Sequence, residues 1–252
     1  MTARISRRRR LLAALGVAAL AALAVACAGP QGARSPHARP PSGNMDVLGP
    51  IPALEPSPLP ADWVTEGGVG RGQLAVVERD GIPALMVVNG GANFVAAKPT
   101  RASLLATPYL SWSWSMEPPA SGTHPVRLVV GFRGGNRHNP APPAWPPAST
   151  GRGLPAHDRA IVITWGESAL QRGAIVKPDA AKVPQPPSRY IARGGRENAG
   201  AWWLETVDLS DIYRRSWPED DASSAEITFI GVAASAGASA SPAYLSGIRL
   251  SR

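Results

Sequence analysis

The sequence predicts an all-β fold, an antiparallel β-sandwich of jelly-roll type with one short helix. From Leu110 to Met116, large apolar and small polar residues alternate strictly, as they do in a strand with one buried face. Short apolar runs separated by Gly, Pro, Asn and Ser continue from Ala61 to Arg252, a length that suits a single domain. Many short strands with one helix favour two packed sheets.

The N-terminal segment, residues 1–26, has the layout of an export signal. Arg4 and the run Arg7–Arg10 precede 16 apolar residues from Leu11 to Ala26. A bilayer-spanning helix needs about 20 apolar residues, so this run has the length of a cleaved signal core and is short for a permanent anchor. The arginine run also fits a loose twin-arginine pattern, so two export routes remain open.

The signal leads into Cys27, the only cysteine of the chain. Residues 23–27, Leu-Ala-Val-Ala-Cys, resemble the lipobox of bacterial lipoproteins, although that pattern prefers Leu where Ala24 stands. The resemblance implies a diacylglyceryl group on the Cys27 thiol and a further acyl chain on its amine, and two or more chains hold a protein stably at a membrane. The usual sorting pattern favours the outer membrane, because Ala28 and not Asp follows. An ordinary secretory signal is the alternative.

Residues 27–60 are expected to be a tether between the lipidated cysteine and the domain. They contain nine prolines among Gly, Ser and Ala, a composition that cannot bury a core. We therefore place the domain at residues 61–252. With one cysteine the domain has no internal disulfide, so its core alone must stabilise it.

The net charge is much smaller once the signal is removed. The whole chain has 26 Lys and Arg against 18 Asp and Glu, but residues 1–26 hold five arginines and no acid, which leaves 21 against 18, or +3. No basic stripe stands out in the domain, so we expect no nucleic-acid partner.

The expected strands are short apolar or alternating runs, and the expected helix runs from Asp211 to Trp217 with Ser210 as N-cap and Pro218 after its end. The strands are Gln73–Glu78, Ala84–Val88, Asn93–Ala96, Ala102–Ala106, Tyr109–Met116, Val126–Arg133, Ala160–Gly166, Arg189–Arg193, Trp202–Val207, Glu226–Ala233 and Ala243–Leu250. The segment 134–158 has six prolines and one tryptophan, Trp145. It is far longer than ordinary connections, which indicates a binding loop or disorder.

Several strand motifs, in order and spacing, resemble the bacterial envelope-associated family called domain of unknown function 3047. The segments that carry the resemblance are Pro108–Trp114, Val126–Phe132, Ile163–Gly166 and Trp203–Glu205, with Asp208, Tyr213 and Arg214. The resemblance covers roughly residues 63–250 and implies a galactose-binding-like sandwich. It supplies no function. Near the C-terminus the family tends to carry aspartates where this chain has Ala234 to Ser239.

The candidate binding residues are aromatic. Aromatic faces stack on sugar rings, and the indole N–H reaches polar partners. Trp112, Trp114 and Trp165 lie on the apolar phase of their strands and are expected in the core. Trp202 and Trp203 are adjacent and point to opposite faces. Trp145, Trp203 and Tyr213 are therefore the candidate ligand-binding residues, and Cys27 is the candidate lipidation site.

Catalysis is the second hypothesis. Paired carboxylates cleave glycosidic bonds, and Glu167, Glu205 and Asp208 are the candidates, although their separation decides the chemistry. The turn at Gly166-Glu167-Ser168 lacks the second glycine of a nucleophile elbow. The histidines 124, 138 and 157 have no zinc-binding spacing, so we expect no metal and no cofactor.

The sequence thus predicts a non-catalytic, membrane-anchored envelope lipoprotein that binds a carbohydrate or another envelope component. Two alternatives stay open: a glycan hydrolase that uses the carboxylates above, and a structural partner of another envelope protein.

Overall fold

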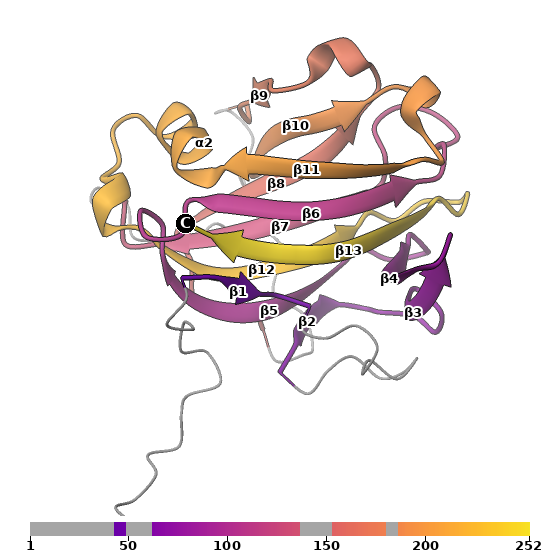
Figure 1. Cartoon of the computed structure of the whole chain (residues 1–252), viewed down its shortest axis with the longest axis horizontal. Helices are drawn as coiled ribbons and strands as arrows, with labels where there is room; N and C mark the ends of the chain where they lie inside the picture. The colour runs from indigo at the N-terminus through magenta and orange to yellow at the C-terminus, as the bar shows by residue number, and fades with distance from the viewer. Residues whose placement is uncertain (1–42, 49–61, 137–152, 180–185) are drawn as a thin grey trace, which may run out of the picture. The chain divides into compact units, whose positions relative to one another are not determined.

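The computed structural model describes residues 43–48, 62–136, 153–179 and 186–252, and these form two β-sheets packed face to face (Figure 1). Sheet 1 has the order β11 (Trp202–Asp208), β6 (Tyr109–Met116), β13 (Pro242–Ser251), β4 (Ile82–Val88) and β3 (Leu74–Arg79), with β1 (Met45–Asp46) beside β13. Sheet 2 has the order β2 (Val64–Gly67), β5 (Phe94–Ser103), β12 (Glu226–Ala234), β7 (Val126–Arg133), β8 (Arg159–Gly166), β10 (Ser188–Gly194) and β9 (Ile175–Val176). The predicted β-sandwich is confirmed.

The core lies between the sheets and is built on three tryptophans. Trp112 and Trp114 point inward from β6, and Trp165 points inward from β8. The ring centroids of Trp112 and Trp114 lie 5.2 Å apart, and those of Trp114 and Trp165 lie 5.7 Å apart, both in edge-on geometry. Edge-on pairs suit the ring quadrupole, so this contact joins sheet 1 to sheet 2. The core position predicted for these tryptophans is confirmed.

The strands β6 and β7 have the bounds that alternation predicts, because each has one face in the core. The segment around Pro99 was predicted to separate two strands, and this is wrong: β5 is continuous from Phe94 to Ser103. Pro99 lies beyond the stretch of β5 that pairs with β2, so the missing proline N–H breaks no bond to that strand. Opposite it, the pairing with β12 shifts between Ile227 and Phe229, and the shift turns Phe229 to the outer face.

One strand pair departs from the expected antiparallel pattern. β10 runs parallel to β8, whereas every other described pair is antiparallel. Parallel neighbours need a crossover of a dozen or more residues. The connection from Gly166 to Ser188 supplies it, and it includes the 3-10 helix Ala169–Gln171 and β9. It returns the chain along the edge of sheet 2.

The helix α2 (Leu209–Ser216) begins two residues earlier than predicted. Its N-cap is Asp208 and not Ser210, because a carboxylate oxygen of Asp208 accepts hydrogen bonds from the backbone N–H of Ser210 and Asp211. The described residues contain no other α-helix, and no helix among them has the length and hydrophobicity to cross a bilayer.

Part of the expected tether belongs to the folded domain. Met45 and Asp46 pair with Leu250 and Arg249 of β13, and Val47 and Leu48 are buried in the core. β1, β2 and β9 were not predicted, since strands of two to four residues are too short to show a period. Residues 1–26, Cys27 and the remainder of the tether lie outside the described residues.

The two described ends of the segment 134–158 meet where β7 ends and β8 begins, in the interior of the strand order of sheet 2. A carboxylate oxygen of Asp158 accepts a hydrogen bond from the backbone N–H of Gly134 at 2.9 Å, and the N–H of Asp158 donates to the carbonyl of Phe132 at 2.9 Å. Residues 137–152, with Trp145 and His138, are not among those the structure describes.

Candidate binding pocket

Sheet 2 carries the candidate site on its outer face, the face turned away from the core. In β7 the residues Val126, Leu128 and Val130 enter the core, so the intervening Arg127 points outward. In β8 and β10 the same alternation turns Val162 and Arg189 outward, and these two residues are paired in register. Arg127 and Arg189 therefore belong to one surface.

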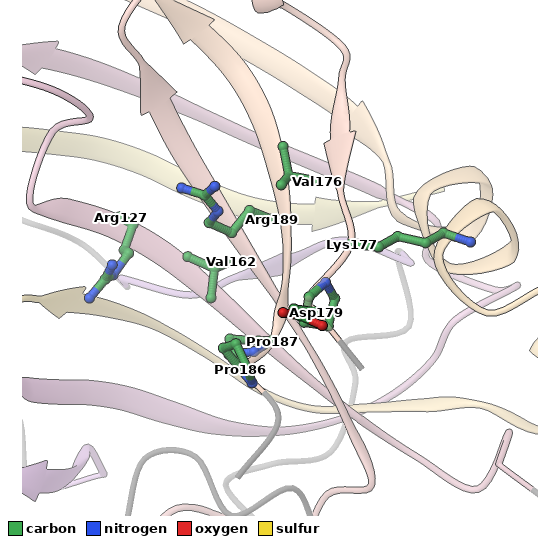
Figure 2. Close-up of a pocket in the computed structure, with 9 residues that line it drawn as sticks. Arg127, Val162, Val176, Lys177, Asp179, Pro186, Pro187 and Arg189 are labelled. Atoms are coloured by element: carbon green, nitrogen blue, oxygen red, sulfur yellow. The ribbon is translucent and has the colours of Figure 1, made fainter. Parts of the chain in front are cut away.

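The crossover between β8 and β10 completes a pocket on this face. Its volume is about 390 Å³, and Figure 2 shows its lining. The lining residues come from β7, β8, β9, β10 and the loop between β9 and β10, and they are Arg127, Val162, Val176, Lys177, Pro178, Asp179, Pro186, Pro187 and Arg189. This volume lies within the range of sites that hold small molecules.

The two arginines have no charged partner. Among the described residues, no carboxylate forms an ion pair with Arg127 or Arg189. Arg127 donates from its Nη2 to the hydroxyl of Ser235, while its Nε is buried without a hydrogen-bond partner. Burial lowers the pKa of the Arg127 guanidinium below its ordinary value, and the charge of Arg189 lowers it further. A guanidinium stays protonated in proteins, so both arginines contribute positive charge to the pocket.

The remaining charged residues of the pocket lie differently. Figure 2 shows the side chain of Lys177 directed away from the two arginines, and the carboxylate of Asp179 near Pro187. The walls are apolar, from Val162, Val176 and the prolines. The pocket therefore combines a cationic side at Arg127 and Arg189 with rigid apolar surface.

The two arginines were not proposed as site residues from the sequence. Arg127 occupies an outward-facing position in an otherwise apolar strand, and this is the only feature of the sequence that distinguishes it. An arginine at such a position is ordinarily solvated, so the feature does not indicate a binding site. Arg189 lies on a strand that is adjacent to β8 but separated from β7 by the whole crossover segment. Their proximity follows from strand order, which the residue pattern does not reveal.

Trp203, a predicted binding residue, is half-buried at the edge of sheet 1 and already has contacts. Its ring lies 3.8 Å from the guanidinium carbon of Arg193, and its indole N–H donates to the carbonyl of Asn198 at 2.8 Å. Cation–π contact of this kind covers one face of the ring. Trp203 faces the same side of β11 as Glu205, while Trp202 faces the other, as their adjacency predicts.

Tyr213 was predicted as a surface aromatic, and the structure buries it completely. Its ring packs on Phe132 and Trp217 at centroid distances of 5.2 and 5.0 Å, and its hydroxyl donates to Asp220 at 2.9 Å. Burial and this hydrogen bond raise the pKa of Tyr213. Its face is therefore closed to a ligand, and α2 is amphipathic with this tyrosine on its buried side. The third candidate, Trp145, lies outside the described residues.

The carboxylate candidates for catalysis have separate structural surroundings. Glu205 is 2% exposed and lies between Arg172, at 3.0 Å, and Arg193, with which it forms a short ion pair. Asp208 caps α2; partial burial raises its pKa, but the hydrogen bonds from Ser210 and Asp211 lower it by more, so the net shift is downward. Glu167 is exposed after the end of β8. Glu205 joins the edge of sheet 1 to the edge of sheet 2.

The described histidines are structural. His124 is buried, and its Nδ1 accepts a hydrogen bond from the backbone N–H of Val126 at 3.1 Å. His157 packs edge-on against Phe229, with a centroid distance of 5.1 Å. In the part of the chain that the structure describes, no group of three His, Cys, Asp or Glu residues is arranged to hold a metal ion.

No protein-family model matches this chain, and no curated protein matches it. Three similar solved structures are the family 11 carbohydrate-binding module from Clostridium thermocellum, the K2 cleaved adhesin domain of Lys-gingipain and the Trichoderma harzianum endoglucanase 3 of family GH12. Identities are 9%, 10% and 12%, with TM-scores of 0.35, 0.39 and 0.32. The matches cover 79%, 84% and 75% of this chain and 93%, 99% and 97% of the other chain, respectively. Likeness at this level says nothing of what this chain binds.

The ion pairs of Glu205 predict a stability effect. We expect Glu205→Gln to lower the free energy of unfolding by about 3 kcal/mol, because removal of one partner leaves buried charge on Arg193 uncompensated. The effect is at the low end for such pairs because Arg172 is 58% exposed and keeps its hydration. Urea denaturation measures it. The exposed Glu167→Gln serves as the control, with a change below about 0.5 kcal/mol. Equal values for the two variants would contradict the structural role.

His124 predicts a pH dependence of stability. Burial lowers its pKa to about 4, below the value of about 6.5 expected in the unfolded chain. The unfolded state therefore binds the proton first. The stability that neutral His124 contributes is complete above about pH 6.5 and falls by about 3 kcal/mol as the pH drops to 4. Unfolding curves at pH 7 and pH 4 measure this change in the free energy of unfolding. The variant His124→Asn keeps an acceptor for the backbone N–H of Val126, and we expect it to lose the part of the pH dependence that His124 causes. An unchanged slope in the variant would assign the dependence to another group.

Proposed function

We propose that this chain is an exported, lipid-anchored envelope protein whose β-sandwich is a non-catalytic binding module for an envelope polymer, held at the pocket of sheet 2. One observation carries the proposal: a pocket of ligand size is lined by two arginines that form no ion pair with a carboxylate among the described residues. A charged ligand in the pocket supplies such a partner.

The carboxylates support binding over hydrolysis. A hydrolase of the retaining or inverting kind needs two carboxyl groups that flank one bond, with one able to give up a proton. Glu205 lies between two guanidinium groups, and Asp208 is occupied by three hydrogen bonds at the start of α2. Neither residue lines the pocket. These are the roles of residues that stabilise a fold.

The address of the protein is part of the same proposal and rests on the sequence. Residues 1–26 act as the export signal, Cys27 receives the lipid, and Ala28 directs the protein to the outer membrane, where the domain faces the periplasm. Membership of the family called domain of unknown function 3047 is likewise proposed, on the strand motifs of β6, β7, β8 and β11.

Blocking the pocket tests the binding proposal. Val176 lines the pocket and its side chain is partly exposed, so Val176→Trp fills the pocket without entering the core. We expect saturable binding of the full chain to a panel of cell-envelope polysaccharides, measured by calorimetry, and loss of that binding in Val176→Trp. Leu170→Trp is the control, because Leu170 is 97% exposed outside the pocket. Equal binding in both variants would refute the pocket, and capture of one envelope protein in place of any polymer would favour a structural partner.

Replacement of Cys27 tests the anchor. We expect Cys27→Ser to move the protein from the membrane fraction to the soluble fraction, because no thiol remains to carry the diacylglyceryl group. Cell fractionation and the intact mass of the purified protein measure this. A variant that still sediments with membranes, or a wild-type chain whose mass lacks acyl chains, would contradict lipidation.

A further inference from the structure

The chemistry of the pocket restricts its ligand further, provided that the proposed function holds. Arg159, Arg172 and Arg193 on the same domain are each paired with a carboxylate, Asp220 for the first and Glu205 for the other two. Arg127 and Arg189 are paired with none among the described residues. Arg127 is partly buried and Arg189 is exposed. A partly buried charge without a counter-charge costs free energy, so an anion from outside the chain would stabilise Arg127 and is reached from solvent by Arg189.

The donor geometry of arginine indicates an oxyanion. A guanidinium presents N–H groups in a planar fork that matches the two oxygens of a carboxylate, and charge-assisted bonds of this kind are stronger than neutral ones. Arg127 and Arg189 both line the pocket, and they lie two strands apart on the same face of sheet 2. Burial lowers the pKa of Arg127 and the charge of Arg189 lowers it further, and an anion bound beside both guanidinium groups offsets that repulsion.

The apolar walls favour an acidic sugar over a compact anion such as phosphate. Val162, Val176, Pro186 and Pro187 surround the pocket beside the arginines. An inorganic or lipid phosphate is polar on all sides and leaves these walls uncovered. A sugar ring has C–H groups on its faces, which pack on Val and Pro side chains, while a ring carboxylate reaches the guanidinium groups.

We infer that the pocket of Arg127 and Arg189 holds a hexuronate residue of an acidic polysaccharide, its carboxylate on the two arginines and its ring against Val162, Val176 and the prolines. Specificity for acidic over neutral chains then comes from two outward-facing arginines, and the ring contacts contribute to the affinity for both kinds.

Polygalacturonate and its methyl ester provide the test, because they share a backbone and differ in charge. We expect the full chain to bind the acid at least about tenfold more tightly than the ester, a ratio that corresponds to 1.4 kcal/mol, in calorimetry at fixed ionic strength. In Arg189→Ala, the acid should bind about tenfold more weakly and the ester should be unaffected. Arg133→Ala is the matched control: Arg133 stands on the same face of β7 outside the pocket, and the variant should bind like the wild type.

The outcomes separate this inference from the proposal on which it rests. Equal affinity for acid and ester, with binding lost in Val176→Trp, would keep the binding module and overturn the acidic ligand. Binding of the acid that Val176→Trp leaves unchanged would overturn the pocket itself. Equal loss in Arg133→Ala and Arg189→Ala would reduce the effect to general attraction by surface charge. Displacement of the polymer by inorganic phosphate at lower concentration than by monomeric galacturonate would assign the pocket to a compact oxyanion, and no binding of either polymer would also overturn the inference.

Discussion

The contact of Trp114 with Trp165 across the two sheets is the constraint on which the other features depend. Side chains alternate in a strand with a period of two. Where a tryptophan enters the core, the residues before and after it in the same strand therefore point to the outer face. Through the pairing of β7, β8 and β10, this phase places Arg127, Val162 and Arg189 together on the outer face of sheet 2. A slip of one residue in β8 would turn Val162 and Thr164 toward the core and Trp165 toward the outer face, and the contact of Trp165 with Trp114 would be lost.

Ion pairs with carboxylates give several arginines of this domain a structural role. Arg172 and Arg193 hold Glu205 between the edges of the two sheets, and Arg159 forms two hydrogen bonds with Asp220, which follows α2 in the chain. Arg127 and Arg189 form no such pair among the described residues, and both line the pocket of sheet 2. Arg133 also forms none but lies outside the pocket, so the place of an arginine in the pocket, and not the lack of a partner alone, makes it a candidate for binding.

The predictability of each element depended on how local its signal is. The bounds of β6 and β7 follow from alternation over eight residues, and the end of α2 from Pro218, whereas its start was placed two residues late because Asp208 and not Ser210 caps it. β1 and β9 have two residues each and exist only because β13 and β10 offer them backbone partners. β5 continues through Pro99 because β2 pairs only with the part of β5 before that residue. Tyr213 is buried because α2 packs it against Phe132. Both depend on contacts between distant segments.

The sequence by itself determined the class of fold, the inward tryptophans and the expectation of a lipid-anchored, exported chain, because each of these follows from composition or from a period within one segment. Only the tertiary structure decided the site. Arg127 and Arg189 are 62 positions apart in the chain, and they line one pocket because β10 returns parallel to β8 through a crossover that also supplies the pocket wall. The order of strands in a sheet is a property of long-range pairing, and no local pattern encodes it.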